Sequence, residues 1–364
     1  MDEQALIGQT TVSVMAGRSY LRHVRQGLSA VERVRGRAVQ LLDGSAVDAA
    51  WLERVGVCVD ELLVIGREHA DLGLYCAINE KINSPLRYSA LHAVCCALMV
   101  MLGARWLDWS EDQVRSITSA ALTMNVAMGP LQDQLARQAE APSREQRELI
   151  DRHAQRAVEM LEQAGVSDEM WLHAVREHHV AHQIADAEPV DSAARAAELL
   201  RRVDIYAAKL SPRRMRAALT PAIAARGALL GVRHEPDAIG ATLLRVLGLY
   251  PPGVYVELAS GEVGVVIERG SRAHTPVVVV LRRPEGNVLL VPQARDTALG
   301  RFAVRRGVDA TQVSVGAGHA KVLSARLQLG LPPSAAALEA KPGSDAGTDA
   351  DADTDTQAAK VADR

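Results

Sequence analysis

The sequence predicts a mainly α-helical protein with a small antiparallel β-module towards its C-terminus. Up to about Tyr250, apolar residues recur at the three- and four-residue spacing of amphipathic helices. After Tyr250, apolar and polar residues alternate instead, which is typical of strands that have one buried face. A chain of 364 residues is long enough for two or three domains that each bury a core.

The formal net charge of -3 is unevenly distributed along the chain. Residues 333–364 hold seven acidic and three basic side chains, which leaves the remainder close to neutral. A neutral body disfavours bulk nucleic-acid binding. The single Phe and the four Trp also leave little material for aromatic base-stacking platforms.

The cysteine pattern and the N-terminus predict a cytoplasmic protein. Cys58, Cys76, Cys95 and Cys96 lie in apolar helical contexts without CxxC spacing, so we expect reduced core residues. The N-terminus lacks a basic start followed by an apolar run, and the longest apolar run, from Ala93 to Leu102, is too short for a span. We therefore expect neither a signal peptide nor a membrane span.

Residues 1–84 are predicted to form an N-terminal helical domain. An amphipathic helix is expected from about Ser19 to Leu42, and two further helices follow at about 46–58 and 59–76. The first apolar stripe fits either a homodimer seam or a packed globular helix. Nothing in this region resembles a catalytic motif, so sensing, dimerisation and docking to a partner protein are all open.

Residues 85–250 are predicted to form a second helical domain. Its first helix, from Leu86 to Leu102, carries His92. Ser110 and Ser143 are expected N-caps, the first with Gln113 at the capping-box position. The helix after Ser110 directs Met124 towards the core, and the helix after Ser143 carries His153.

Three imidazoles and a carboxylate are predicted to meet in this second domain. His153 and His179 fall on apolar stripes, His178 lies one step round the helix from His179, and Asp204 shares a stripe with apolar residues. A buried carboxylate is costly unless it is paired or bound to a metal. These ligand types suit one divalent transition metal ion, iron, manganese or zinc. The alternatives are a buried Asp–His hydrogen bond without metal, or a separate pair of His178 and His182.

A basic cluster of Arg213, Arg214 and Arg216 follows the helix that carries Asp204. Guanidinium groups there could grip phosphate bidentately. The alternative is an exposed basic turn that neutralises a helix C-terminus.

The region from about Leu86 to Tyr250 resembles an HD-GYP domain, the bacterial branch of the HD phosphohydrolases that cleaves cyclic di-GMP at a two- or three-metal site. AALTMNVAMG stands in the place of the family's AALLHDIGK, REHHVAH in that of its HHE motif, and RRVDIYAAKLSPRRMR in that of VADVYDALTSxRPYR. The resemblance implies an HD-type helical bundle and a cyclic di-GMP ligand. It also implies metal ligands and, in Arg213 and Arg216, phosphate contacts; the ligand positions are His92, His153, His178, His179 and Asp204.

Departures from the family pattern predict loss of two-metal hydrolysis. Met124 and Asn125 occupy the positions of the family's His-Asp pair, and neutral Asn125 cannot bridge two cations. Tyr88, Met128 and Val180 stand where the family has Glu, Lys and Glu, and the glycine-containing GYP loop is missing before Asp204. Either one cation is held by the surviving ligands, or methionines fill the vacated space.

The C-terminal part is predicted to comprise a β-module over residues 251–316, a short helix over 317–332 and a disordered acidic tail over 333–364. Hairpin turns are expected at Ser260-Gly261-Glu262 and at Pro284-Glu285-Gly286. The tail has almost nothing to bury. Its alternating aspartates, from Asp349 to Asp355, lack the glycine and the terminal glutamate of a calcium loop.

The sequence leaves three functions open. The first is a degenerate, catalytically inactive protein of cyclic di-GMP signalling that binds a nucleotide or a partner protein. The second is a metal-dependent phosphohydrolase with a rearranged single-metal site. The third is a purely structural scaffold.

Overall fold

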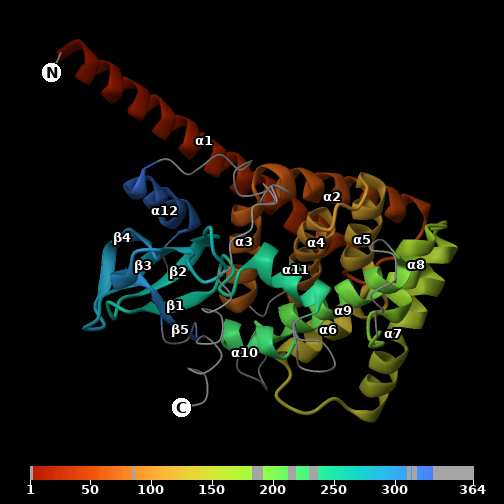
Figure 1. Cartoon of the computed structure of the whole chain (residues 1–364). Helices are drawn as coiled ribbons and strands as arrows, with labels where there is room; N and C mark the ends of the chain where they lie inside the picture. Colours follow the sequence, from red (N-terminus) through yellow and green to blue (C-terminus); the bar gives the residue numbers. More distant parts are fainter. Residues whose placement is uncertain are drawn as a thin grey trace, which may run out of the picture. The chain divides into compact units, whose positions relative to one another are not determined.

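The computed structural model describes residues 3–83, 87–182, 192–211, 219–228, 237–309, 313 and 318–330. They belong to one compact unit, Met1–Pro332, whereas the second unit, Pro333–Arg364, lies outside the described residues. The described part is mainly helical with a small C-terminal antiparallel sheet (Figure 1), so the predicted class is confirmed. The domain boundaries stay a prediction.

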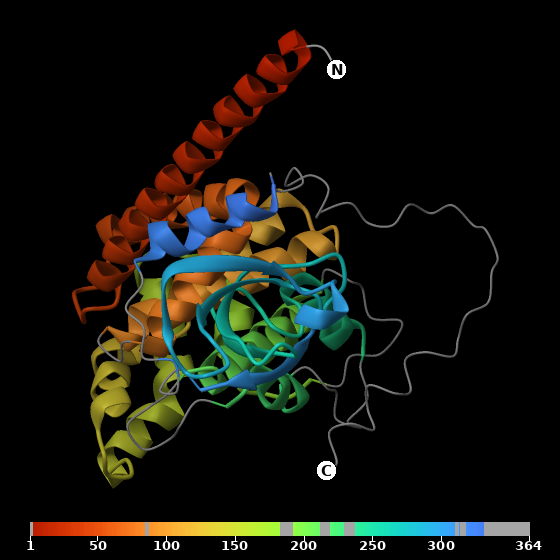
Figure 2. The ribbon, with the colours of Figure 1, turned by 90° about the vertical axis from the view of Figure 1, so that its left-hand side faces the viewer.

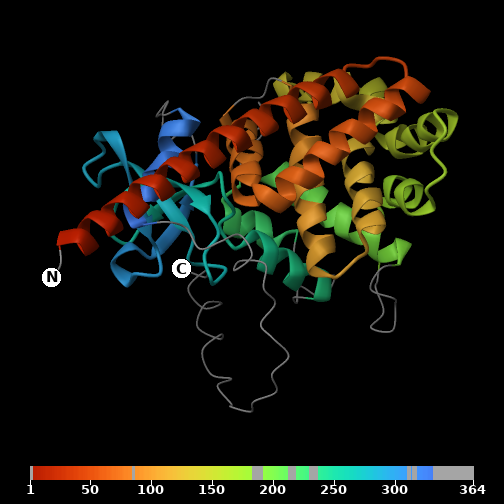
Figure 3. The ribbon, with the colours of Figure 1, turned by 90° about the horizontal axis from the view of Figure 1, so that it is seen from above.

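Three helices form the N-terminal region: α1 (Glu3–Leu41), α2 (Ala49–Glu68) and α3 (Ala70–Asn83). Helix α1 begins well before the predicted Ser19, because the preceding residues lack a clear apolar stripe that periodicity could detect. Figure 3 shows α1 running past α12 and along α2, and contacts with both helices agree with that view.

Helix α4 (Tyr88–Trp106) is the central element of the helical part. It is apolar on all sides and packs against α3, α5, α9 and α1. A helix that is hydrophobic all round is normally a core helix or a membrane span. Among the described helices it alone is long and apolar enough to cross a membrane. Because 89% of its apolar stretch is buried inside the protein, as in a core helix, it is weak evidence for a membrane span.

The next elements are α5 (Glu111–Thr123), a 3-10 turn (Val126–Met128), α6 (Gly129–Arg137), α7 (Arg144–Gln163) and α8 (Glu169–Glu177). Both predicted N-caps are confirmed. Ser110 and Ser143 each accept a hydrogen bond from the backbone N–H three residues on, and each forms a complete capping box. The Trp171 indole N–H donates to the Thr123 hydroxyl at 2.8 Å, which holds α8 against the end of α5.

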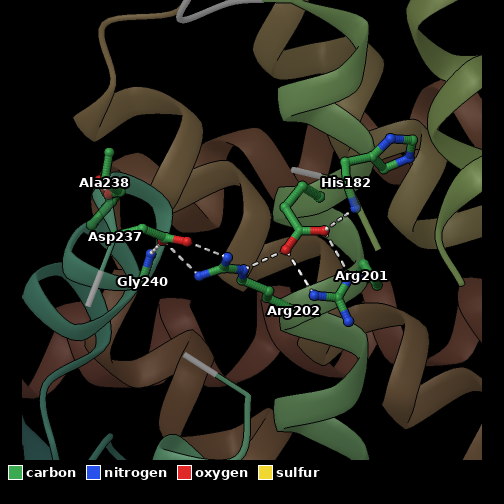
Figure 4. A network of polar contacts seen from close by, with 8 residues as sticks. His182, Arg201, Arg202, Asp237, Ala238 and Gly240 are labelled. Carbon is green, nitrogen blue, oxygen red and sulfur yellow. Dashed lines mark hydrogen bonds and ion pairs between the residues drawn. The ribbon is translucent and has the colours of Figure 1, made fainter. Parts of the chain in front are cut away.

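Helix α9 (Ala193–Lys209) is followed by α10 (Pro221–Arg226) and α11 (Ala238–Leu247). A buried ion-pair network joins α9 to α11 (Figure 4). Arg202 donates to Glu198 on its own helix and to Asp237, which caps α11, at 2.7 Å in both cases. Two charged partners therefore fix the position of Arg202, two residues before Asp204.

The β-module is a five-stranded antiparallel sheet in the order β4-β3-β2-β1-β5. Both predicted hairpin turns lie between paired strands. The register shifts four times along the sheet, and such bulges increase twist and curvature; Figure 2 shows the strands curling round. The strands are β1 (Tyr255–Leu258), β2 (Val263–Glu268), β3 (Val277–Arg282), β4 (Val288–Asp296) and β5 (Val304–Val308).

The β-module shares one continuous apolar core with the helices. The Asn79 amide donates to the Gly253 carbonyl and to the Tyr255 hydroxyl, at 3.1 Å each, which ties the module to α3. The short piece expected after residue 317 forms α12 (His319–Ser324) and a 3-10 turn (Ala325–Leu329).

Candidate metal centre

Three histidines from α7 and the end of α8 bring their ring nitrogens together. His153 Nε2 lies 3.3 Å from His178 Nε2 and 3.2 Å from His179 Nε2. One ligand nitrogen from each of the three lies within 4.8 Å of the others. We call this group the histidine trio.

Backbone carbonyls hold the opposite nitrogens of two of these rings. His153 Nδ1 donates to the Ile150 carbonyl at 2.5 Å, and His178 Nδ1 donates to the Val175 carbonyl at 2.7 Å. A carbonyl oxygen only accepts, so the proton of each neutral ring is on Nδ1. Both Nε2 atoms then present lone pairs to each other, an arrangement that a shared cation stabilises. Metal-binding histidines commonly donate their other N–H to a carbonyl in this way.

The spacing of the trio also fits a metal ion. With a metal–nitrogen distance of about 2.0 to 2.1 Å, two ligands of a tetrahedral ion are separated by about 3.3 Å. The separations of His153 Nε2 from the Nε2 atoms of His178 and His179, 3.3 and 3.2 Å, agree with that value. The donor set therefore fits one divalent transition metal held by three imidazoles.

Burial favours the neutral form of two imidazoles of the trio, those of His153 and His178. His178 is fully buried, and this burial, together with the neighbouring His179, lowers the pKa of His178 to about 3. Burial also lowers the pKa of His153, although its bond to the Ile150 carbonyl opposes the shift. Only the neutral ring can bind a metal, so both are ready to do so near pH 7.

A second group lies on α4 and α9. The His92 Nε2 lies 2.7 Å from Asp204 Oδ1, and the Cys96 thiol lies one turn along α4, 3.6 Å from the same nitrogen. The Tyr88 ring stacks on the His92 ring at a centroid distance of 5.6 Å and an interplanar angle of 10°. This stack and the carboxylate fix the orientation of the His92 ring.

Asp204 connects the two groups electrostatically. Burial alone would raise the pKa of its carboxyl, but the hydrogen bond from His92 and the electrostatic effect of the nearby His92, His178 and His179 side chains lower the pKa well below its usual range. The charge of Asp204 in turn opposes the lowering of the pKa of His178. Asp204 is therefore an ionised carboxylate in contact with His92, and its charge also acts on His178 of the trio.

The chain around His178 differs from the expected continuous helix. Helix α8 ends at Glu177, and His178 is its C-cap. The turn that follows buries His178 and exposes His179, which reverses the predicted placement of the two. The alternative helical pair of His178 and His182 does not form, since His182 lies beyond the helix and its backbone N–H donates to Glu198.

Four of the five departures from the family pattern lie at or near the helix ends described above. Met124 is buried and caps α5, Asn125 is buried before the 3-10 turn, and Met128 is partly buried at the start of α6. Tyr88 is fully buried beside His92, whereas Val180 is exposed. Arg213, Arg214, Arg216 and the region of the missing GYP loop, 183–191, lie outside the described residues.

Sequence reasoning missed Cys96 as a candidate ligand. It assigned all four cysteines to the core, and burial confirms that assignment. The signal was nevertheless present, because His92 and Cys96 are four residues apart on a helix, a spacing that puts two side chains on one face.

Comparison with known proteins finds a cyclic di-GMP phosphodiesterase of Pseudomonas aeruginosa that is 26% identical over 264 residues. The alignment covers 71% of this chain and 61% of that protein. The chain is a distant relative of this enzyme. No family model and no solved structure matches the chain.

Proposed function

We propose that this chain is a degenerate HD-GYP-type protein that binds one divalent metal at the histidine trio and acts in cyclic di-GMP signalling by binding rather than by cleavage. The observation that carries the proposal is the approach of His153 Nε2 to the Nε2 atoms of His178 and His179, at 3.3 and 3.2 Å. Hydrogen bonds to backbone carbonyls fix the orientation of two of these rings. A metal bound there would supply a positive charge that attracts a phosphoryl oxygen.

The ligand class is supported by the relationship to a cyclic di-GMP phosphodiesterase, together with the motif resemblance. The lack of cleavage is supported by Met124 and Asn125. A thioether is a poor ligand for a hard metal site, and an amide cannot supply the bridging carboxylate of a metal pair. Binding of the nucleotide therefore does not require turnover.

A single-metal phosphohydrolase is the second candidate. It is favoured by the trio itself, because three protein ligands leave a coordination position open, as in catalytic zinc sites. Such an enzyme would act on a phosphoester at one metal, without the bridged pair. A purely structural scaffold would account for Asp204 through its hydrogen bond with His92, but it would not explain the converging lone pairs of the trio.

Isothermal titration of the metal-loaded chain with cyclic di-GMP, followed by chromatography of the mixture, separates these functions. We expect weak binding and no linear product. Arg213→Ala together with Arg216→Ala should abolish the heat while leaving the thermal midpoint nearly unchanged, since paired arginines are well suited to grip phosphate. The matched control is Arg144→Ala, an exposed arginine on α7.

Two results would contradict the binding proposal. Linear product that disappears in His178→Ala would favour the single-metal enzyme. No heat and no thermal shift with cyclic di-GMP, its linear product or GMP would leave interaction with a partner protein as the function.

A further inference from the structure

The group on α4 and α9 contains a donor that the histidine trio lacks. His92 Nε2, Cys96 Sγ and an Asp204 oxygen all lie within 4.8 Å of one another. His92 and Cys96 come from adjacent turns of α4, and Asp204 comes from α9, which packs against it. Two separate helices therefore present nitrogen, sulfur and oxygen to one small volume.

The distances within this group suit a tetrahedral ion. A metal–sulfur distance of about 2.3 Å and a metal–nitrogen distance of about 2.0 to 2.1 Å separate the two ligand atoms by about 3.6 Å. The Cys96 Sγ to His92 Nε2 distance is 3.6 Å. Asp204 Oδ1 lies 2.7 Å from His92 Nε2. Metal binding would move these two atoms apart by about half an ångström, to the separation of about 3.3 Å expected for two ligands of a tetrahedral ion.

We propose that Cys96 is a thiolate ligand of a second mononuclear metal site, completed by His92 and Asp204, and that this site selects zinc. This inference rests on the metal binding proposed above for the same region. A thiolate is a soft donor that favours zinc over manganese or magnesium, whereas carboxylates alone favour the harder ions.

Binding at this site has a defined proton balance. The Cys96 thiol loses its proton to solvent when the sulfur–metal bond forms. His92 Nε2, which now donates to Asp204, must present a lone pair instead, so the imidazole proton moves to Nδ1 or leaves. Asp204 is already ionised and exchanges its hydrogen bond for a metal bond.

The neighbouring cysteine provides a matched control. Cys95 and Cys96 are adjacent on α4 and equally buried. Cys95 lies close enough to Tyr206 to raise the pKa of that phenol further, after the larger effect of burial. Serine at either position makes the same chemical change in the same helix, but it is the Cys96 sulfur that lies within 4.8 Å of His92 Nε2 and of an Asp204 oxygen.

The test is cobalt substitution of the full chain, read by near-ultraviolet absorption and by metal analysis. We expect a thiolate-to-cobalt charge-transfer band in the wild type and in Cys95→Ser. Both Cys96→Ser and Cys96→Ala should lose the band and about one cobalt per chain, with far-ultraviolet circular dichroism confirming that they fold. X-ray absorption of the zinc form should show a sulfur neighbour at about 2.3 Å, lost in the Cys96 variants.

A His153→Ala variant separates this inference from the proposed function. It should lose the cobalt held by the trio and keep the charge-transfer band. If it loses no cobalt while the band still depends on Cys96, the trio proposal fails and the thiolate site stands. No band in the wild type, or a band that persists in Cys96→Ser, overturns the thiolate site whatever the trio binds.

Discussion

Individual histidines in this chain differ in role according to the atoms that face their ring nitrogens. In the trio, backbone carbonyls accept hydrogen bonds from the Nδ1–H groups of His153 and His178, which leaves each Nε2 lone pair available for a cation. His69 Nδ1, between α2 and α3, instead lies 3.0 Å from His23 Nε2 of α1. The two rings of that pair resist being protonated together, because this would place two positive charges side by side.

The His23–His69 contact predicts acid sensitivity. Burial, followed by the repulsion from His23, lowers the pKa of His69, while Glu68 opposes the shift; burial also lowers the pKa of His23. Below about pH 6.5 the unfolded chain therefore binds more protons than the folded chain. The contribution of the two histidines to the free energy of unfolding is fully present above that pH and is lost as the pH falls below it. For His69 the loss is at most about 1.4 kcal/mol per pH unit.

Chemical denaturation of wild type and His69→Gln between pH 7.5 and about 5 measures this effect. The variant should show a shallower fall in the free energy of unfolding. His274→Gln, on an exposed loop, serves as the control and should follow the wild type. Equal slopes for all three proteins would show that this pair does not govern the acid response.

The sequence predicted the burial of a candidate site residue correctly where a continuous helix carried it. His153 is buried on its apolar stripe with Ala157 and Leu161, as periodicity indicated. The order of His178 and His179 was wrong, because periodicity extends a helix past the point where it actually ends. Cys96 was missed because an apolar environment explains a cysteine equally well with or without a ligand role.

At the scale of elements, α9 links the two candidate metal-binding groups, the histidine trio and the group of His92, Cys96 and Asp204, to the rest of the helical part. Glu198 is 1% exposed and accepts hydrogen bonds from both Arg201 and Arg202. Burial alone would raise the pKa of Glu198, but these two guanidinium groups lower it. Arg202 then reaches Asp237 at the start of α11.

Glu198→Ala should destabilise the protein by about 3 to 5 kcal/mol, because it leaves two arginines without their shared carboxylate, one of them buried. The exposed pair of Arg144 and Glu148 offers a control, for which Glu148→Ala should cost less than about 1 kcal/mol. Urea denaturation compares the two. Similar small losses in both variants would mean that the network contributes no more than a surface ion pair.

Element boundaries were harder to predict than element types. The capping boxes at Ser110 and Ser143 fixed two helix starts correctly, because a cap is a local hydrogen-bond pattern. The docking of the β-module on α3 depends on contacts between distant residues, such as Asn79 with Gly253. No spacing along the chain encodes such contacts.

At the scale of the whole molecule, helices and sheet share one core, so the metal region is part of a larger packed body. The relationship to a cyclic di-GMP phosphodiesterase covers 71% of the chain. Hydrolysis of cyclic di-GMP by the whole molecule would have to proceed with Met124 and Asn125 in place of the family's His-Asp pair.

We predict no measurable cyclic di-GMP hydrolysis by the wild type. Met124→His with Asn125→Asp should increase the bound metal but should not restore efficient turnover, since Met128, Val180 and the missing loop remain. Metal analysis and product chromatography on the same samples measure both quantities. High turnover in the double variant would locate the entire defect at these two positions.

The central claim is that the histidine trio holds a metal ion, and metal content per chain tests it most directly. For protein purified without chelator, we predict about one equivalent or more of a divalent transition metal in the wild type, and one equivalent less in His178→Ala, because removing one of three ligands weakens binding sharply. His173→Ala, in the same helix, should match the wild type. Wild-type protein that contains no metal and takes none up from added zinc, manganese or iron would contradict the claim.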